Sequence, residues 1–201
     1  MITCIVLAAG ESKRFNGNKL LFEVKPNITM IEMLLSSILA SKVDRIVVVL
    51  GHDAELVNKK VQGLCNDIIT VLNPNYERGG MSSSIRQGME EALDSQAIMI
   101  TPADIPFIPS TVFDQLIDYY LSMSPVVIIP TYQRQKGHPI LIGSQLFKHV
   151  LNISEEKRGL KEIIEKFREK IVFLPTNFQG ILYDIDNVSD MTYFKAKMDD
   201  Y

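Results

Sequence analysis

The sequence has only two cysteines and no long apolar run, and each shortage excludes a class of protein. Cys4 and Cys65 lie far apart and form no C-x-x-C pair, so we expect buried, reduced thiols and neither a zinc site nor a thioredoxin-like motif. No apolar run approaches the ~20 residues of a membrane helix. The N-terminal residues lack the basic stretch and apolar core of a secretory signal, so we expect a cytoplasmic protein.

Neither positive nor negative charge predominates in the sequence. The 21 Lys and Arg residues nearly balance the 24 Asp and Glu residues, which leaves a net charge of −3. This balance gives no electrostatic basis for binding nucleic acid or an anionic membrane. The 201 residues, of which 46% are apolar, suit a single domain over residues 1–201 with a sizeable core. Any phosphate chemistry must therefore use local cations or a metal ion.

Apolar runs of strand length alternate with segments of helical period along the chain. This alternation predicts an α/β fold with βαβ units, a mostly parallel sheet and helices on both faces. Residues 131–142 and 175–186 are less regular and predict an antiparallel edge or hairpin. The expected strands are Ile2–Leu7, Arg45–Leu50, Ile68–Leu72, Ala97–Thr101, Val126–Pro130 and Ile171–Leu174, and the expected helices are Ile28–Ala40, Ala54–Leu64, Ser83–Leu93, Thr111–Leu121 and Lys157–Arg168.

The first expected strand runs directly into a loop of small residues that is followed by cations. Ala8-Ala9-Gly10 lets a ligand approach the backbone, and Arg14 and Lys19 add positive charge to the same crevice. The loop is not a P-loop, because one residue separates its second glycine from the lysine, and G-x-G-x-x-G is absent. The pattern indicates a site for nucleotide phosphates, with a surface turn bearing solvated cations as the alternative.

Asp104 is the best candidate for a metal ligand. It follows an apolar strand and lies between Pro102 and Pro106, whose fixed φ angles restrict the loop. Functional groups of open α/β sheets gather at the carboxyl ends of the parallel strands, so Asp104 should lie near the first loop. A carboxylate beside phosphates requires a divalent cation between them, and Mg²⁺ takes one or two protein carboxylates. A helix cap or a turn is the alternative role.

These segments belong to an ordered set of motifs. L-A-A-G-x-S-x-R-F and N-K-L-L are followed by Gly80-Met81-Ser82-Ser83-Ser84-Ile85, P-A-D-I-P, Gly137-His138-Pro139-Ile140-Leu141 and Asp184-Ile185-Asp186-Asn187. The set resembles the MobA-like nucleotidyltransferases, and within them the molybdenum cofactor cytidylyltransferases, from residue 5 to about residue 190. The resemblance implies a three-layer, Rossmann-like nucleotidyltransferase fold, whose closing metal-site strand would carry Asp184 and Asp186.

The resemblance also implies a reaction. An acceptor phosphate would attack the α-phosphorus of a nucleoside triphosphate and release pyrophosphate, with no protein nucleophile. Arg14 would clamp the β and γ phosphates, and Lys19 would lie near the α-phosphate or the attacking phosphate, although these two roles are interchangeable. Asp104 and Asp186 would hold Mg²⁺. Asp184 would lie on the same face of an extended strand as Asp186, so it could share or replace that role.

The same resemblance assigns the nucleotide contacts. The backbone and hydroxyls of the G-M-S-S segment would face the base and ribose, although its serines also suit a helix cap. In the family, L-A-A-G accompanies cytidylyl transfer and L-A-G-G guanylyl transfer, so Ala9 favours CTP. The expected nucleotide-binding residues are Leu7, Ala8, Ala9, Gly10, Arg14, Lys19, Gly80, Met81, Ser82 and Ser83.

A late loop would receive the second substrate. Gly137 and His138 resemble the family's acceptor loop, and His138 would contact substrate, take part in chemistry or have only a structural role. We expect His52 and His149 to be surface or packing residues. The mixed charges around Glu155 and Glu156 predict a solvated face.

Three functions are compatible with these residues. The first is a cytidylyltransferase that acts on molybdopterin, the second a nucleotidyltransferase that acts on a sugar phosphate, methylerythritol phosphate or another phosphate ester. The third is a non-catalytic carrier or accessory protein that delivers molybdenum cofactor to a partner oxidoreductase. The expected partners are a nucleoside triphosphate, a phosphate-bearing small molecule and, transiently, a molybdoenzyme or its chaperone.

Overall fold

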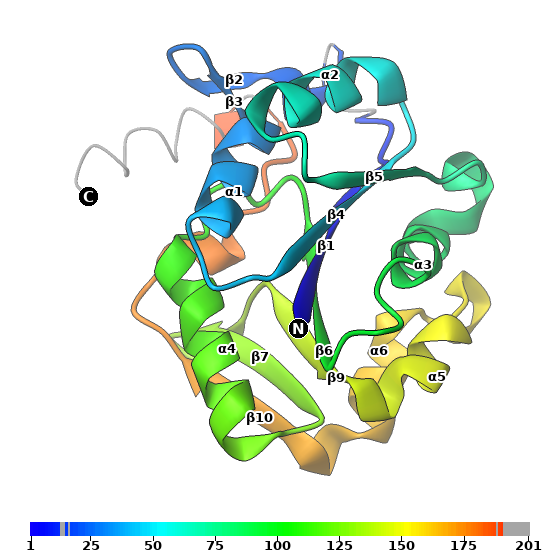
Figure 1. The fold of residues 1–201 in the computed structure, drawn as a ribbon, viewed down its shortest axis with the longest axis vertical. Coiled ribbons are helices and arrows are strands. Elements are labelled where there is room, and N and C mark those ends of the chain that lie inside the picture. The colour runs from blue at the N-terminus through cyan, green and yellow to red at the C-terminus, as the bar shows by residue number, and fades with distance from the viewer. Residues whose placement is uncertain (13–14, 16, 188, 191–201) are drawn as a thin grey trace.

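A mixed sheet of eight strands forms the centre of the computed structural model, which describes residues 1–12, 15, 17–187 and 189–190 (Figure 1). A second, two-stranded sheet lies apart from it. The strands are β1 (Ile2–Ala8), β2 (Glu23–Lys25), β3 (Ile28–Thr29), β4 (Arg45–Leu50), β5 (Ile69–Leu72), β6 (Ala97–Pro102), β7 (Val127–Tyr132), β8 (Gln135–Lys136), β9 (Ile140–Gly143) and β10 (Ile171–Pro175).

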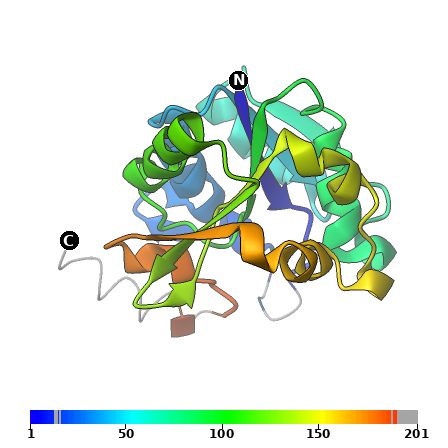
Figure 2. The same cartoon turned by 90° about the horizontal axis from the view of Figure 1, so that it is seen from below.

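The α-helices are α1 (Met30–Leu39), α2 (Ala54–Leu64), α3 (Tyr76–Met89), α4 (Ser110–Met123), α5 (Phe147–Leu151) and α6 (Leu160–Lys166). Two apolar clusters form the core, one shared by the sheet with α1, α2 and α4, and the other with α3, α5 and α6. Figures 1 and 2 show the two groups of helices on opposite sides of the sheet. This arrangement confirms the expected three-layer fold. Among the described helices, none has the length and apolar character needed to span a membrane.

The strand order of the main sheet is β10–β7–β9–β6–β1–β4–β5. β1 pairs in parallel with β4 and β6, and β4 pairs in parallel with β5. β7 and β8 form the expected hairpin, whereas β9 is antiparallel to both β6 and β7 and lies inside the sheet. The hairpin expected as one alternative for residues 131–142 is therefore confirmed, whereas β9 is antiparallel but lies inside the sheet and not at its edge. All four residues of β9 are buried, which an internal strand requires.

β1 is a strand because nearly every residue in it is apolar, and six of its seven residues are buried under helices on both faces. α1 begins at Met30 and not at Ile28, because Ile28–Thr29 pairs with β2 in a short hairpin. At the start of α1, the Glu32 carboxylate accepts a hydrogen bond from the Thr29 N–H at 2.8 Å. This contact satisfies a backbone donor that the helix itself leaves unpaired.

α3 differs most from its predicted bounds. The sequence predicts a helix from Ser83, but a first helical turn already begins at Tyr76. The two parts join at Gly80, whose φ of 57° and ψ of −162° are not helical. Only glycine adopts this conformation without strain, so the glycine that predicts a loop is instead a kink within the element.

Two later predictions also need correction. The expected helix Lys157–Arg168 is interrupted where Arg158 and Gly159 have φ values of 67° and 57°, and α6 begins only after them. The apolar residues before Asp184 form a 3-10 helix, Gln179–Leu182, and not a strand. Gly180 there packs against Phe107, since a Cβ on Gly180 would lie 2.0 Å from the Phe107 carbonyl oxygen.

The two cysteines are free thiols in different environments. Cys4 is buried within β1, and burial raises the pKa of its thiol well above the ordinary value. Cys65 is half-buried at the end of α2, so the expectation of burial is correct only for Cys4.

Candidate active site

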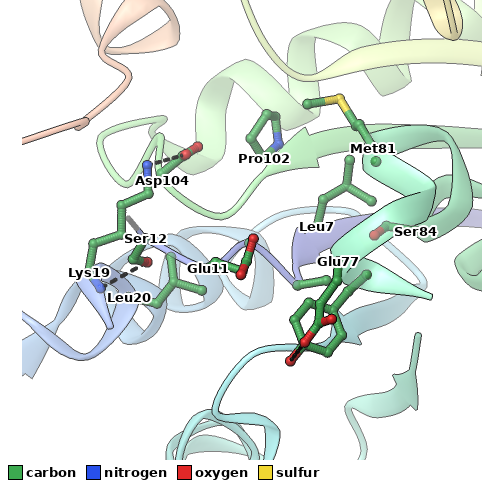
Figure 3. Close-up of a pocket in the computed structure, with 14 residues that line it drawn as sticks. Leu7, Glu11, Ser12, Lys19, Leu20, Glu77, Met81, Ser84, Pro102 and Asp104 are labelled. Atoms are coloured by element: carbon green, nitrogen blue, oxygen red, sulfur yellow. Dashed lines mark hydrogen bonds and ion pairs between the residues drawn. The ribbon is translucent and has the colours of Figure 1, made fainter. Parts of the chain in front are cut away.

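A pocket of about 370 Å³ opens where β1 and β6 end and α3 begins (Figure 3). Its volume lies within the range of roughly 300–1,000 Å³ that is typical of small-molecule sites. Its position at the carboxyl ends of parallel strands is the one expected for ligands of open α/β sheets. The pocket is lined by Leu7, Ala9, Gly10, Glu11, Ser12, Lys19, Leu20, Tyr76, Glu77, Gly80, Met81, Ser84, Pro102 and Asp104.

The first loop supplies one wall of this pocket. Four of its predicted nucleotide contacts, Leu7, Ala9, Gly10 and Lys19, line the pocket. Ala8 does not, because it is the last residue of β1, pairs with β4 and is only 1% exposed. Arg14 lies outside the residues that the structure describes, so its predicted contact with the phosphates stays a prediction.

The end of β4 packs directly against this loop. The His52 N–H donates to the Ala9 carbonyl oxygen at 3.3 Å. A Cβ on Gly51 would lie 2.6 Å from that same oxygen and 2.7 Å from the Ala9 Cβ. A side chain at Gly51 would therefore displace the loop, so the glycine allows β4 to fix the position of Ala9.

α3 supplies the opposite wall. Of the four nucleotide contacts predicted here, Gly80 and Met81 line the pocket, whereas Ser82 and Ser83 are buried behind the wall. Ser84, which was not among the predicted contacts, does line it. The side-chain amide of Asn73 donates to the hydroxyls of Ser83 and Ser84 at 2.8 and 3.0 Å. This buried network accounts for the hydroxyls of Ser83 and Ser84, whereas the Ser82 hydroxyl is buried without a partner among the described residues.

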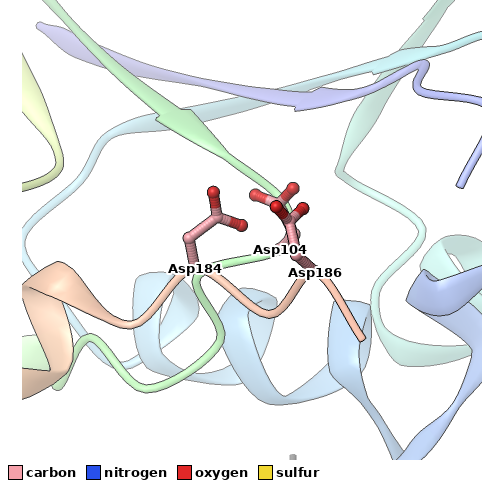
Figure 4. Close-up of side chains that lie close together, drawn as sticks. All are labelled: Asp104, Asp184 and Asp186. Carbon is pink, nitrogen blue, oxygen red and sulfur yellow. The ribbon is translucent and has the colours of Figure 1, made fainter. Parts of the chain in front are cut away.

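Three carboxylates meet at one end of the pocket. One oxygen from each of Asp104, Asp184 and Asp186 lies within 4.8 Å of the other two (Figure 4). Asp104 follows β6, and the other two belong to the segment after the 3-10 helix at 179–182. That segment is not the strand expected from the sequence. Asp184 and Asp186 nevertheless both point to Asp104, and the structure therefore places Asp184 beside the two predicted ligands.

The three carboxylates of this cluster concentrate negative charge that favours binding of a metal cation. Desolvation of its carboxyl group, followed by the negative charge of Asp104, raises the pKa of Asp184 to about 6, although the Asp184 side chain is exposed as a whole. Oδ1 of Asp104 is buried and has no hydrogen-bond partner among the described residues. A buried, unpartnered carboxylate oxygen is costly unless a ligand satisfies it.

Lys19 joins the first loop to the carboxylates. Its ammonium nitrogen lies 2.6 Å from Oδ2 of Asp104 and 3.3 Å from Oδ1 of Asp186. Desolvation lowers the pKa of Lys19, but the carboxylates around it, Asp104 foremost, outweigh that effect, and the pKa is raised. The backbone of Lys19 is also fixed, because its N–H donates to the Ser12 hydroxyl at 3.2 Å.

The carboxylate cluster has the donor set that a hard divalent cation requires. Mg²⁺ and Mn²⁺ prefer oxygen ligands, and three carboxylates from two segments converge here, one of them with a buried oxygen that no described residue contacts by a hydrogen bond. Asp104, Asp184 and Asp186 are therefore the residues that could hold such an ion.

The predicted acceptor loop lies beside the pocket without lining it. The His138 N–H donates to the Ile181 carbonyl at 3.0 Å, and a Cβ on Gly137 would lie 2.6 Å from the Ile181 side chain. Burial lowers the pKa of His138, against the opposing effects of a hydrogen bond to Ile100 and of the Asp104 charge. Nδ1 of His138 is buried and has no partner within the described part of the chain. Its substrate role stays a prediction.

Several lining residues were not predicted. Glu11, Ser12 and Leu20 belong to the first motif and could have been inferred from their neighbours, whereas Tyr76 and Glu77 lie in a turn that the sequence did not identify as helical. Figure 3 shows Lys19 and Asp104 at one end of the pocket and Glu77 at the other. The Lys19 end also carries the carboxylate cluster, so phosphate binding there would need a divalent cation in addition to the Lys19 ammonium.

Residues 4–171 match the family model of the MobA-like NTP transferase domain. The chain is also 29% identical over 169 residues to the bifunctional protein GlmU of Francisella tularensis subsp. novicida. That match covers 81% of this chain and 36% of the relative, so the chain spans about a third of the length of these curated proteins.

Solved structures of other proteins share the fold of this chain. Rv0371c from Mycobacterium tuberculosis H37Rv has a TM-score of 0.84 at 20% identity over 97% of both chains. A nucleotidyl transferase from Methanothermobacter has a TM-score of 0.83 at 21% identity, covering 98% of this chain and 97% of that one. A further structure of Rv0371c is a complex with manganese, with a TM-score of 0.80. A divalent metal is therefore bound by a protein of this fold.

Proposed function

The chain belongs to the MobA-like NTP transferase family, and from this premise we propose that it transfers CMP from CTP to molybdopterin and releases pyrophosphate. The family supports nucleotidyl transfer itself. The choice of CTP rests on Ala9 in the L-A-A-G loop, and the choice of acceptor rests on the resemblance of the whole motif set. The proposed metal is Mg²⁺.

One observation carries the proposal. Lys19 lines the pocket and also contacts two of the three clustered carboxylates, so the nucleotide pocket and the candidate metal site are parts of one crevice. A carrier protein needs to enclose its cargo, but it has no need of a cation and clustered carboxylates at one end of a nucleotide-sized pocket. Transfer between two phosphate-bearing substrates does need them.

The position of each residue in the pocket suggests which part of the substrates it would bind. The first loop and α3 would hold the base and ribose between Ala9 and Met81, which puts the triphosphate at the Lys19 end. Lys19 would contact the α-phosphate or the acceptor phosphate, and Arg14 would hold the β and γ phosphates. The acceptor phosphate is ionised near neutral pH and needs no protein base, so catalysis is mainly positioning and charge compensation.

Asp104, Asp184 and Asp186 would hold Mg²⁺. When bound, the ion would supply the positive charge that offsets the repulsion between the two phosphate groups. The carboxylates need to converge on one point for this purpose, and the tight loop after β6 and the segment before Asn187 bring them there. Gly137 and His138 would lie toward the acceptor.

A product assay tests the proposal. The protein is mixed with molybdopterin and Mg²⁺, CTP, GTP, ATP and UTP are supplied in separate reactions, and products are identified by mass spectrometry. The expected result is the cytidylyl dinucleotide of molybdopterin together with pyrophosphate, with CTP preferred. Sugar phosphates and methylerythritol phosphate serve as alternative acceptors in parallel reactions.

The outcomes separate the three functions. Transfer to another phosphate ester but not to molybdopterin would overturn the acceptor while keeping nucleotidyl transfer. Tight binding of molybdenum cofactor with no pyrophosphate from any combination would favour a carrier. The Asp104→Asn protein is the control for a contaminating transferase, because it should produce no dinucleotide.

A further inference from the structure

Glu155 connects the segment between α5 and α6 to the wall of the pocket. Its Oε1 accepts a hydrogen bond from the Ser82 N–H at 2.7 Å. The two residues are 73 positions apart, and the charges around Glu155 predicted only a solvated face. The side chain is indeed exposed as a whole, but its carboxylate has a specific partner. Local sequence pattern gives no indication of this contact.

The kink in α3 creates the need for an acceptor at this point. Gly80 is not helical, so Met81 and Ser82 begin a new helical stretch whose first N–H groups have no acceptor within the helix. A Ser, Thr, Asp or Asn before a helix ordinarily supplies that acceptor from its side chain. Gly80 has no side chain, and Glu155 supplies a carboxylate in its place. A negative charge is also favourable at a helix N-terminus.

Close packing accompanies the hydrogen bond. A Cβ on Gly80 would lie 2.6 Å from both Cγ and Cδ of Glu155, and a Cβ on Gly159 would lie 2.9 Å from the Ser82 hydroxyl. A second bond ties the same segment to α3, because the Arg86 guanidinium donates to the Ile153 carbonyl. The segment between α5 and α6 therefore packs tightly against the kink at Gly80, which restricts movement of either one relative to the other.

We propose that Glu155 is a positioning residue for nucleotide binding. By accepting the Ser82 N–H and filling the space beside Gly80, it holds the kink that presents Gly80, Met81 and Ser84 to the pocket. Glu155 does not itself line the pocket. The inference rests on the proposed nucleotidyl transfer, since this wall would receive the base and ribose. The charged groups of the reaction, Lys19 and Asp104, lie at the other end (Figure 3).

This separation predicts a change in binding and not in chemistry. In the Glu155→Ala protein, the KM for CTP should rise about tenfold, the loss expected when a charge-assisted hydrogen bond is removed, while kcat stays within about twofold. Glu155→Gln should restore most of the affinity, because its amide oxygen can still accept the Ser82 N–H. Glu156→Ala is the matched control, an exposed neighbouring glutamate whose loss should change neither constant.

Hydrogen exchange supplies a readout that does not depend on activity. Exchange in a peptide covering residues 80–84 should be faster in Glu155→Ala than in wild type, and unchanged in Glu156→Ala. Unchanged exchange, or faster exchange with an unchanged KM, would overturn the proposal. If wild type transfers no nucleotidyl group, the proposed function fails first. Hydrogen exchange then still tests the contact between Glu155 and the Ser82 N–H. Calorimetric titration with CTP and Mg²⁺ tests whether this contact supports nucleotide binding. Equal affinities of wild type and Glu155→Ala for CTP would overturn the positioning role of Glu155.

Discussion

The ammonium nitrogen of Lys19 lies 2.6 Å from Oδ2 of Asp104, at the junction of the pocket and the carboxylate cluster. The same nitrogen donates to the Ile185 carbonyl at 3.0 Å, across 166 positions of sequence. One side chain thus joins the first loop to the segment that carries Asp184 and Asp186. The cation also balances part of the negative charge that the cluster concentrates.

We expect Lys19→Met to destabilise the metal-free protein. Methionine keeps an apolar stem but removes the cation, and Lys19 and Asp104 are only 14% and 21% exposed. Their broken pair should cost about 1–3 kcal/mol in free energy of unfolding. Urea unfolding in the presence of a chelator measures this loss, and added Mg²⁺ should return more stability to the variant than to wild type.

Lys42→Met is the control for that experiment. Lys42 pairs with Asp118 at 2.7 Å, but both side chains are more than half exposed, so the stability should not change measurably. Equal stability of the Lys19→Met protein and wild type would contradict the structural role of the Lys19 contact.

Asp104→Asn should abolish turnover with the fold intact. Asparagine has the same size but lacks the charge that a divalent ion and Lys19 require, so kcat/KM for CTP should fall about 100-fold or more. Steady-state kinetics and circular dichroism measure the two effects, with Asp118→Asn as an exposed control. Near-normal turnover in a folded Asp104→Asn protein would refute the metal assignment.

Arg14 is predicted from its motif to clamp two phosphates. Arg14→Ala should therefore raise the KM for CTP about tenfold or more, and Arg14→Lys should also be impaired, because one ammonium cannot replace a planar, bidentate guanidinium. Arg45→Ala removes a half-buried arginine that pairs with Asp94 and does not line the pocket, so the KM for CTP should not change. If kinetics of Arg14→Ala match those of wild type, Arg14 is an ordinary surface residue.

CTP should outcompete GTP, and the first loop should set this preference. A site that matches cytosine leaves guanine groups unpaired, at about 1–3 kcal/mol for each mismatch. Ala9→Gly should lower the ratio of kcat/KM for CTP over GTP, because Ala9 lines the pocket and its Cβ abuts Gly51. Ala8→Gly is the matched control, since Ala8 is buried away from the pocket. A wild-type ratio at or below unity would exclude a cytidylyl preference.

Stability should depend on pH through His138. Burial lowers the folded-state pKa of this histidine below its ordinary value of 6.5. Below pH 6.5 the unfolded chain therefore binds a proton that the folded protein does not, and the stability contribution present above pH 6.5 is lost as pH falls. The difference in unfolding free energy between pH 7.5 and pH 5 should be smaller in His138→Gln than in wild type. His149→Gln, which changes an exposed residue, should leave that difference unchanged.

The sequence correctly predicted those helices and strands whose ends are determined by neighbouring residues. The bounds of α2, Ala54–Leu64, were predicted correctly, because the helical spacing of its apolar residues ends where the polar flanking residues begin. α1 was placed two residues early, since an apolar Ile28 suits either a helix or the short strand β3 that it forms. The position of β9 inside the sheet depends on pairing with β6 and β7, which a single strand's residues do not encode.

The site was predicted where motif and topology agree. The positions of Asp104 and Lys19 at the strand ends followed from their loops, and a spacing of two correctly grouped Asp184 with Asp186, although the segment is not a strand. Glu155 and Tyr76 were missed for a different reason. Tyr76 lies in the helical turn before the Gly80 kink, and Glu155 contacts the turn after it without lining the pocket. Neither the kink nor this long-range contact follows from a periodic pattern.

The carboxylate cluster is completed late in the chain. Each described strand ends by Pro175, and the family model matches only to residue 171, whereas Asp184 and Asp186 follow both. Ile181 and Ile185 are fully buried, and the Ile185 N–H donates to the Asp104 carbonyl at 3.0 Å, so apolar anchoring brings the two aspartates into place. Because Ile181 and Ile185 are themselves part of the apolar core, the packing that completes this core also closes the carboxylate cluster.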